Sequence, residues 1–212
     1  MTPNPDGITV TGRGEVLTVP DMASVDLGVS VLGATVSDAT AEAAVSTTVV
    51  VASLVDAGVE RVDIATTNYS VSPEYDWQDN QRRLLGYRVN NTVPATIRDM
   101  ARVGDILDGA VSAGGDNTQV SGLTFTIDDD SRLLVAARDA AWADARAKAE
   151  QLARLSGRAL GRAVAIAELG SGPPTPFPMP RFTAAAAAEM ATPIEGGSTS
   201  VMVSLHVRYE FA

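Results

Sequence analysis

The stretch Ser131–Gly157 reads SRLLVAARDAAWADARAKAEQLARLSG, and it is the strongest helix signal in the chain. Alanine is the best helix former, and Leu, Arg, Lys, Glu and Gln fill most of the other positions. Asp128, Asp129 and Asp130 precede the stretch, and carboxylates there can accept hydrogen bonds from the free N–H groups of a helix start. Gly157 suits the left-handed position that ends a helix. One long helix is therefore predicted.

Small residues recur at every fourth position of this helix, and such a row forms one ridge without side-chain bulk. The row consists of Ala137, Ala141, Ala145, Ala149 and Ala153. A sheet or a second helix can come unusually close to such a ridge. We therefore expect this helix to be the buried spine of the fold, with ion pairs such as Asp144–Lys148 on its exposed side.

Hydrophobic periodicity divides the region between residue 22 and this helix into six elements. They are a strand, a helix, two strands, a helix and a strand, at about residues 25–31, 38–57, 61–72, 85–97, 99–114 and 123–127. This order is the split βαβ pattern of ferredoxin-like sheets. Alternating strands at residues 8–19 and 201–211 are expected to extend the same sheet. The predicted class is α+β, a split βαβ (ferredoxin-like) sheet extended by N- and C-terminal strands, with the long Ala-rich helix packed on it.

Composition excludes several classes of function. The net charge of −10 argues against a nucleic-acid partner and against adhesion to an anionic membrane. The absence of cysteine excludes disulfides, thiolate metal sites and a cysteine nucleophile. No uncharged run approaches the roughly 18 residues of a membrane span. The first residues, MTPNPDG, lack the features of a signal peptide, so we expect a cytosolic protein or a mature form with an added Met.

Candidate catalytic and metal-binding residues all have simpler interpretations. His206 is the one histidine, and Ser204 lies two residues away on the same strand, roughly 6.6 Å along it, which is too far for direct contact. The acidic run at 128–130 lacks the spacing of a calcium loop and is interpreted as a helix cap. Gly12 and Gly14 match no phosphate-binding loop and are interpreted as a turn or bulge. No catalytic, cofactor-binding or metal-binding residue is therefore assigned.

Two regions are candidates for contacts with other molecules. Residues 73–81 predict a polar hairpin tip whose Tyr75 and Trp77 either contact a partner or fold back on their own sheet. The Pro/Ala-rich segment at residues 170–197 is too long for an ordinary loop within a domain. Its apolar residues are candidates for burial against a neighbouring subunit: Phe177, Met179, Phe182, Met190 and Ile194. We therefore expect a homo-oligomer larger than a dimer.

An ordered series of short motifs resembles the SIMPL-domain family across residues 8–211. In chain order they are Ile8-Thr-Val-Thr-Gly-Arg-Gly, Pro20-Asp21-Met22-Ala23, Gly58, Thr66, Tyr75, Gly86-Tyr87, Gly114, Ala137-Arg138, Asp144-Ala145-Arg146, Lys148-Ala149, Gly157, Gly161 and Pro193-Ile194. The resemblance implies a single domain at 8–211 after a disordered N-terminus at 1–7. It also implies an α/β protein that assembles into ring- or channel-like homo-oligomers, without agreed catalytic residues.

The family resemblance guides the expected function. Most members are exported bacterial proteins, several of them described as periplasmic immunogenic or oxidative-stress defence proteins. We therefore expect a non-enzymatic, self-assembling protein of the cell envelope, periplasmic or secreted, linked to oxidative-stress defence. The missing signal peptide leaves a cytoplasmic location open. One alternative is an interaction or signalling module that docks a partner through the 73–81 tip or the Pro-rich segment, and another is a carboxylate-dependent hydrolase.

Overall fold

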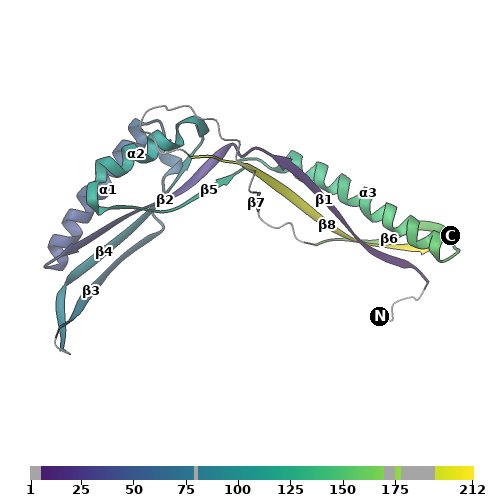
Figure 1. Cartoon of the computed structure of the whole chain (residues 1–212), viewed down its shortest axis with the longest axis horizontal. Helices are drawn as coiled ribbons and strands as arrows, with labels where there is room; N and C mark the ends of the chain where they lie inside the picture. Colours follow the sequence, from purple (N-terminus) through teal and green to yellow (C-terminus); the bar gives the residue numbers. More distant parts are fainter. Residues whose placement is uncertain (1–5, 79–80, 170–174, 178–193) are drawn as a thin grey trace. The chain divides into compact units, whose positions relative to one another are not determined.

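A computed structural model describes residues 6–78, 81–169, 175–177 and 194–212 (Figure 1). The chain divides into two compact units. Unit 1 comprises Met1–Pro20, Ile127–Arg181 and Gly197–Ala212, so it joins the two ends of the chain, and unit 2 comprises Asp21–Thr126 and Phe182–Gly196. We predicted one domain over residues 8–211, because hydrophobic periodicity marks single elements and not their grouping into units.

Unit 1 is an antiparallel sheet with one long helix along it. Strand β8 (Ser198–Phe211) lies between β1 (Ile8–Thr18) and β6 (Leu160–Leu169), and the short β7 (Thr175–Phe177) also pairs with β8. Helix α3 (Ser131–Leu155) packs mainly on β1 and β8. Figure 1 shows this helix running along the strands. The predicted helix is confirmed, and its alanine row is buried in all five positions.

Two strand glycines allow the alanine row to approach β1 very closely. A Cβ at Gly12 would lie 2.6 Å from the Cβ of Ala145 and would overlap the carbonyl oxygen of Ala141. A Cβ at Gly14 would overlap the carbonyl oxygen of Ala137. Both glycines lie in regular pairing with β8, so the interpretation as a turn or bulge was wrong. They are spaced two apart because alternate strand residues face the same side.

Side chains of α3 also bind the backbone of β1, which is an edge strand of this sheet. The Arg13 N–H donates to Asp144 Oδ2 at 2.8 Å, and Lys148 Nζ donates to the Thr11 carbonyl oxygen at 3.0 Å. The predicted Asp144–Lys148 ion pair joins the two at 2.6 Å. Edge strands leave backbone groups unpaired, and here charged side chains from the helix satisfy two of them.

We predict that Gly14→Ala destabilises unit 1, because the new Cβ would overlap the helix backbone. The expected loss is about 1–3 kcal/mol in the free energy of unfolding, as for other overpacked sites. Urea unfolding followed by the fluorescence of Trp142 measures it. A Trp77→Phe background isolates this signal, because the chain has two tryptophans and Trp142 is the one in unit 1.

The matched control is Gly28→Ala, a strand glycine of unit 2 whose added Cβ would meet its neighbours only at 3.8–3.9 Å. The fluorescence of Trp77 in a Trp142→Phe background reports the unfolding of this variant. Gly28→Ala should leave the free energy of unfolding nearly unchanged. Ala145→Leu, with Arg146→Leu as control, makes the same comparison on the helix, again with an expected loss of about 1–3 kcal/mol. Equal, small changes for all four variants would contradict a close strand–helix approach.

A second prediction concerns pH. The hydrogen bond from Lys148, followed by that from the Arg13 N–H, lowers the pKa of Asp144. A carboxyl with a lowered pKa in the folded state contributes stability above its unfolded pKa, and this contribution is lost as pH falls through the folded pKa. The urea midpoint of unit 1 should therefore fall more between neutral pH and about pH 3 in the parent than in Asp144→Asn, which cannot ionise. Parallel acid profiles would show that the carboxylate contributes nothing.

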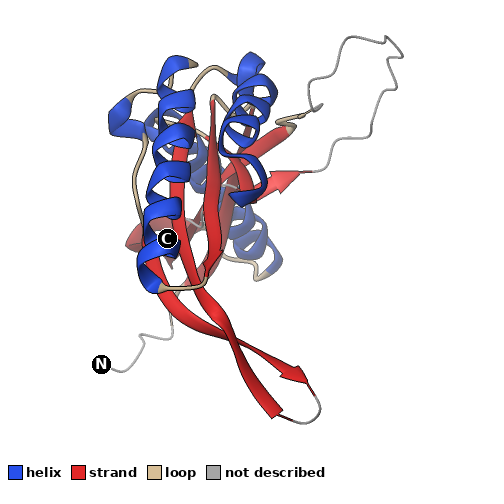
Figure 2. Cartoon of the chain, turned by 90° about the vertical axis from the view of Figure 1, so that its left-hand side faces the viewer, coloured by secondary structure: helices blue, strands red, loops and turns tan. Residues whose placement is uncertain are grey.

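Unit 2 is a four-stranded antiparallel sheet covered by two helices. Its sheet order is β3 (Asn68–Gln78), β4 (Gln81–Ile97), β2 (Met22–Gly33), β5 (Thr118–Thr126). Helix α1 (Val36–Asp56) packs on β2 and β4, and α2 (Val103–Gly114) packs against α1. Short 3₁₀ turns lie at Arg61–Asp63, Met100–Arg102 and Gly115–Asn117. Figure 2 shows the helices on one side of the sheet and the β3–β4 hairpin running past them.

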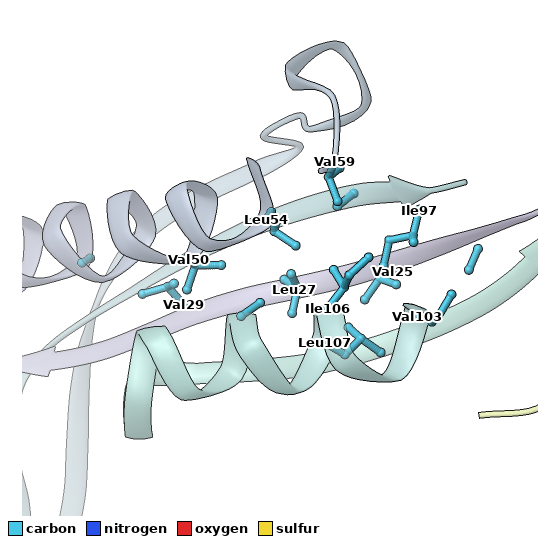
Figure 3. Close-up of a cluster of buried hydrophobic side chains, with 14 of the residues drawn as sticks. Val25, Leu27, Val29, Val50, Leu54, Val59, Ile97, Val103, Ile106 and Leu107 are labelled. Carbon is cyan, nitrogen blue, oxygen red and sulfur yellow. The ribbon is translucent and has the colours of Figure 1, made fainter. Parts of the chain in front are cut away.

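The core of unit 2 is aliphatic, as the low aromatic content requires. Val25, Leu27 and Val29 of β2 meet Val50 and Leu54 of α1. Ile106 and Leu107 of α2 belong to the same cluster (Figure 3). Thr35 caps α1, since its hydroxyl accepts a hydrogen bond from the Asp38 N–H at 3.1 Å. Among the described helices, α1 alone is long and apolar enough to cross a membrane. Its inner face packs on the sheet of unit 2.

The α+β class and the strand–helix–strand–strand–helix–strand order of residues 22–126 are confirmed. Two details were wrong. Strands β1 and β8 do not extend the sheet of unit 2, since they form a second sheet with β6. The strand expected at 61–72 instead spans Asn68–Gln78, so the expected tip at 73–81 is mostly strand. Pro73 and the acidic residues around it resemble a turn in sequence.

Candidate functional site

An uncovered apolar stripe on β3 is the most distinctive surface of unit 2. Alternate residues of this strand are all exposed, and we call them the β3 stripe: Tyr69, Val71, Pro73, Tyr75 and Trp77. The first of them lie opposite Asn91 and Val89 of β4, which face the helices. Because β3 is the edge strand and α1 packs on β2 and β4, no described helix of unit 2 covers the stripe. Trp77 is 69% exposed and Tyr69 53%.

Neighbouring residues of β4 widen the stripe near the end of the hairpin. The register shifts between Glu74 and Tyr75, which places Leu84 opposite Tyr75 and Arg82 opposite Trp77. The Arg82 guanidinium lies 3.6 Å from the centre of the Tyr75 ring, a cation–π contact. Leu84 is also exposed. Thus Tyr75 and Trp77 lie in a strand, beside an arginine, and point out to solvent.

An ion pair on the opposite face holds the base of the hairpin. Arg88 of β4 binds Glu74 of β3 with two nitrogens, one contact being Nη2–Oε1 at 2.8 Å. Its Nη1 also donates to Ser30 Oγ of β2 at 3.2 Å, so one side chain joins three strands. The hydrogen bond from Arg88 lowers the pKa of Glu74. Bidentate arginine–carboxylate pairs fix geometry, so this pair orients the strand that carries the stripe.

An open depression of about 200 Å³ lies where α1 ends. No pattern in the sequence predicted it. Arg98 in its wall pairs with Asp63 at 3.0 and 3.2 Å, and Arg102 donates to the Ala57 carbonyl oxygen at 3.1 Å. A carboxylate-dependent hydrolase would need two close carboxylates, one with a raised pKa. The arginine contacts instead satisfy a carboxylate and the carbonyl group at a helix end, which is a structural role.

His206 lies exposed on β8, opposite Thr11 of β1, with Thr11 Oγ1 3.5 Å from His206 Nδ1. In the acidic run, the Ser131 N–H donates to Asp129 Oδ1 at 3.0 Å. The hydrogen bond from the Ser131 side chain, followed by that from its N–H, lowers the pKa of Asp129. Asp130 occupies the cap position without a side-chain hydrogen bond. In the described part of the chain, no three acidic, histidine or cysteine side chains converge as metal ligands.

The candidate assembly residues of the Pro/Ala-rich segment have different outcomes. Met179, Phe182 and Met190 lie outside the described residues, as does most of the predicted disordered N-terminus. Phe177 lies in β7, where it pairs with Ser198 of β8. Ile194 is partly buried against the core of its own unit. Its burial against a neighbouring subunit stays a prediction.

We predict that His206→Ala folds with the stability of the parent, because His206 is exposed and its one close polar contact is long. The urea midpoint of unit 1, measured by Trp142 fluorescence, should be unchanged. Cells that carry the His206→Ala variant should survive peroxide as well as cells that carry the parent protein. Loss of protection by a folded His206→Ala protein would reveal a chemical role for the imidazole.

Comparison with protein families gives a match over residues 8–209 to SIMPL, described as a protein of unknown function (DUF541). The 26 kDa periplasmic immunogenic protein of Brucella melitensis is 36% identical over 219 residues, covering 99% of this chain and 86% of that protein. The uncharacterized protein YggE of Escherichia coli K12 is 30% identical over 159 residues, covering 74% of this chain and 64% of that protein. The family match includes residues of both units.

Proposed function

Because the chain belongs to the SIMPL family, we propose that it is a non-enzymatic, self-assembling protein of the bacterial cell envelope. The name of the Brucella relative, a periplasmic immunogenic protein, supports the envelope location. We propose a homo-oligomer larger than a dimer, closed as a ring or channel. The proposed link to oxidative-stress defence is supported by the family resemblance alone.

The observation that carries the assembly proposal is the exposed β3 stripe. Monomeric soluble proteins rarely leave a contiguous row of large apolar side chains in water. The stripe also lies on an edge strand, whose unpaired backbone groups invite contact with another chain. A neighbouring copy that covers β3 would remove both features from water.

The same surface supports a second candidate, a module that docks a different protein through Tyr75 and Trp77. Aromatic residues are enriched at the centres of protein interfaces, and both rings are exposed. Assembly and partner docking differ in one measurable property. A docking module stays monomeric when pure, whereas a self-assembling protein does not.

We therefore predict that the pure parent has a mass well above twice its chain mass of 22.0 kDa. Light scattering coupled to size exclusion measures this mass directly. Replacing residues 171–193 with a short Gly/Ser linker, while keeping Ile194 in its core position, should lower the mass if that segment joins subunits. A linker variant with the parent's mass would remove the segment from the interface. A monomeric parent would contradict self-assembly.

A further inference from the structure

Helix α1 has a second uncovered apolar surface. Its inner face packs in the core through residues such as Ala39, Val50 and Leu54. The opposite side is exposed and uncharged, and we call it the α1 outer face: Ala41, Ala44, Val45, Thr48, Val49 and Ala52. Val45 is 65% exposed and Val49 39%, while the Thr48 hydroxyl donates to the Ala44 carbonyl oxygen within the helix. A second apolar face on a helix is normally covered as well.

The β3 stripe and the α1 outer face cannot cover each other within one copy. The stripe is part of the sheet, and α1 turns its inner face to that sheet. The α1 outer face therefore points away from the sheet, and the stripe lies beside α1 on the same side of the sheet. Both surfaces are exposed in the described part of unit 2, so another copy of the chain can cover them.

The charges beside the two surfaces are complementary. Arg82 lies beside Tyr75 at the end of the stripe. The charged residues of α1 are all acidic, and two of them, Asp38 and Glu42, lie in its N-terminal half beside the outer face. Two copies of a chain with a net charge of −10 repel each other at long range. A contact that brings Arg82 near Asp38 and Glu42 offsets part of this repulsion.

The size of the stripe suits a stable interface. A fully buried Tyr or Trp covers about 150–250 Å². With the exposed fractions of Tyr69, Tyr75 and Trp77, these three rings offer roughly 300 Å². A standard interface buries about 800 Å² on each partner. The rings alone provide more than a third of that area, and Val71, Pro73 and Leu84 add to it.

We propose that the β3 stripe of one copy docks on the α1 outer face of the next copy. This inference rests on the proposed self-assembly and names the surfaces that carry it. In the proposed assembly each copy places its stripe on one neighbour and its α1 outer face against another, so the contact is heterologous. Repetition of such a contact closes a ring when the rotation allows it, which agrees with an oligomer larger than a dimer.

Cross-linking tests the contact. Because the chain has no native cysteine, only the introduced thiols can react. Trp77→Cys and Val45→Cys are each purified, mixed after dissociation in mild urea, reassembled, and treated with a short bis-maleimide. The mixture should give a covalent dimer on a denaturing gel, and each variant alone should not. A protein with both substitutions should give a ladder of covalent multimers. Val62→Cys, at a position 84% exposed in unit 2 but outside both surfaces, replaces Val45→Cys as the control and should give no dimer.

Each other result overturns the proposal in a distinguishable way. Cross-linking of Trp77→Cys with itself would show that two stripes meet each other. An oligomeric parent whose mixed variants do not cross-link would keep self-assembly and exclude these surfaces. A monomeric parent by light scattering would overturn both self-assembly and this contact. Val45→Arg guards against loss of folding as an explanation, since it should lower the mass while leaving the circular dichroism spectrum of the parent unchanged.

Discussion

The close contact between β1 and α3 is the constraint on which unit 1 depends. Gly12 and Gly14 remove side chains from the strand, and the alanine row removes them from the helix, so the two backbones meet almost directly. At this distance Asp144 and Lys148 reach the backbone of the edge strand and satisfy an N–H and a carbonyl group. A larger residue at either glycine would separate the helix from the strand and break these bonds together.

This contact joins several of the short motifs by which the chain resembles the SIMPL family. The Thr11-Gly-Arg-Gly motif lies on β1, and the Asp144-Ala-Arg and Lys148-Ala motifs lie on α3, about 130 residues later in the chain. The motifs bind each other, so they mark an architecture rather than a reaction. In unit 2, the β3 stripe and the α1 outer face leave apolar side chains in water.

Sequence periodicity predicted the elements well because burial leaves a regular trace. The alanine row, the α+β class and the element order of residues 22–126 all follow from it. The division into two sheets was not predictable, since pairing partners such as β1 and β8 lie almost 200 residues apart and no local pattern names them. The β3 stripe was predictable in principle, because Tyr69, Val71, Pro73, Tyr75 and Trp77 alternate. Pro73 and Asp76 are typical turn residues, so this part of the strand was predicted as a hairpin tip.

Amide hydrogen exchange at Arg13 tests the strand–helix contact most directly. An outward N–H of an edge strand normally exchanges fast, whereas the account predicts that this one exchanges only when unit 1 unfolds, because it donates to Asp144. Asp144→Ala should raise its exchange rate while amides at the centre of β8 stay protected. Fast exchange at Arg13 in the parent, equal to that in Asp144→Ala, would contradict the contact on which unit 1 depends.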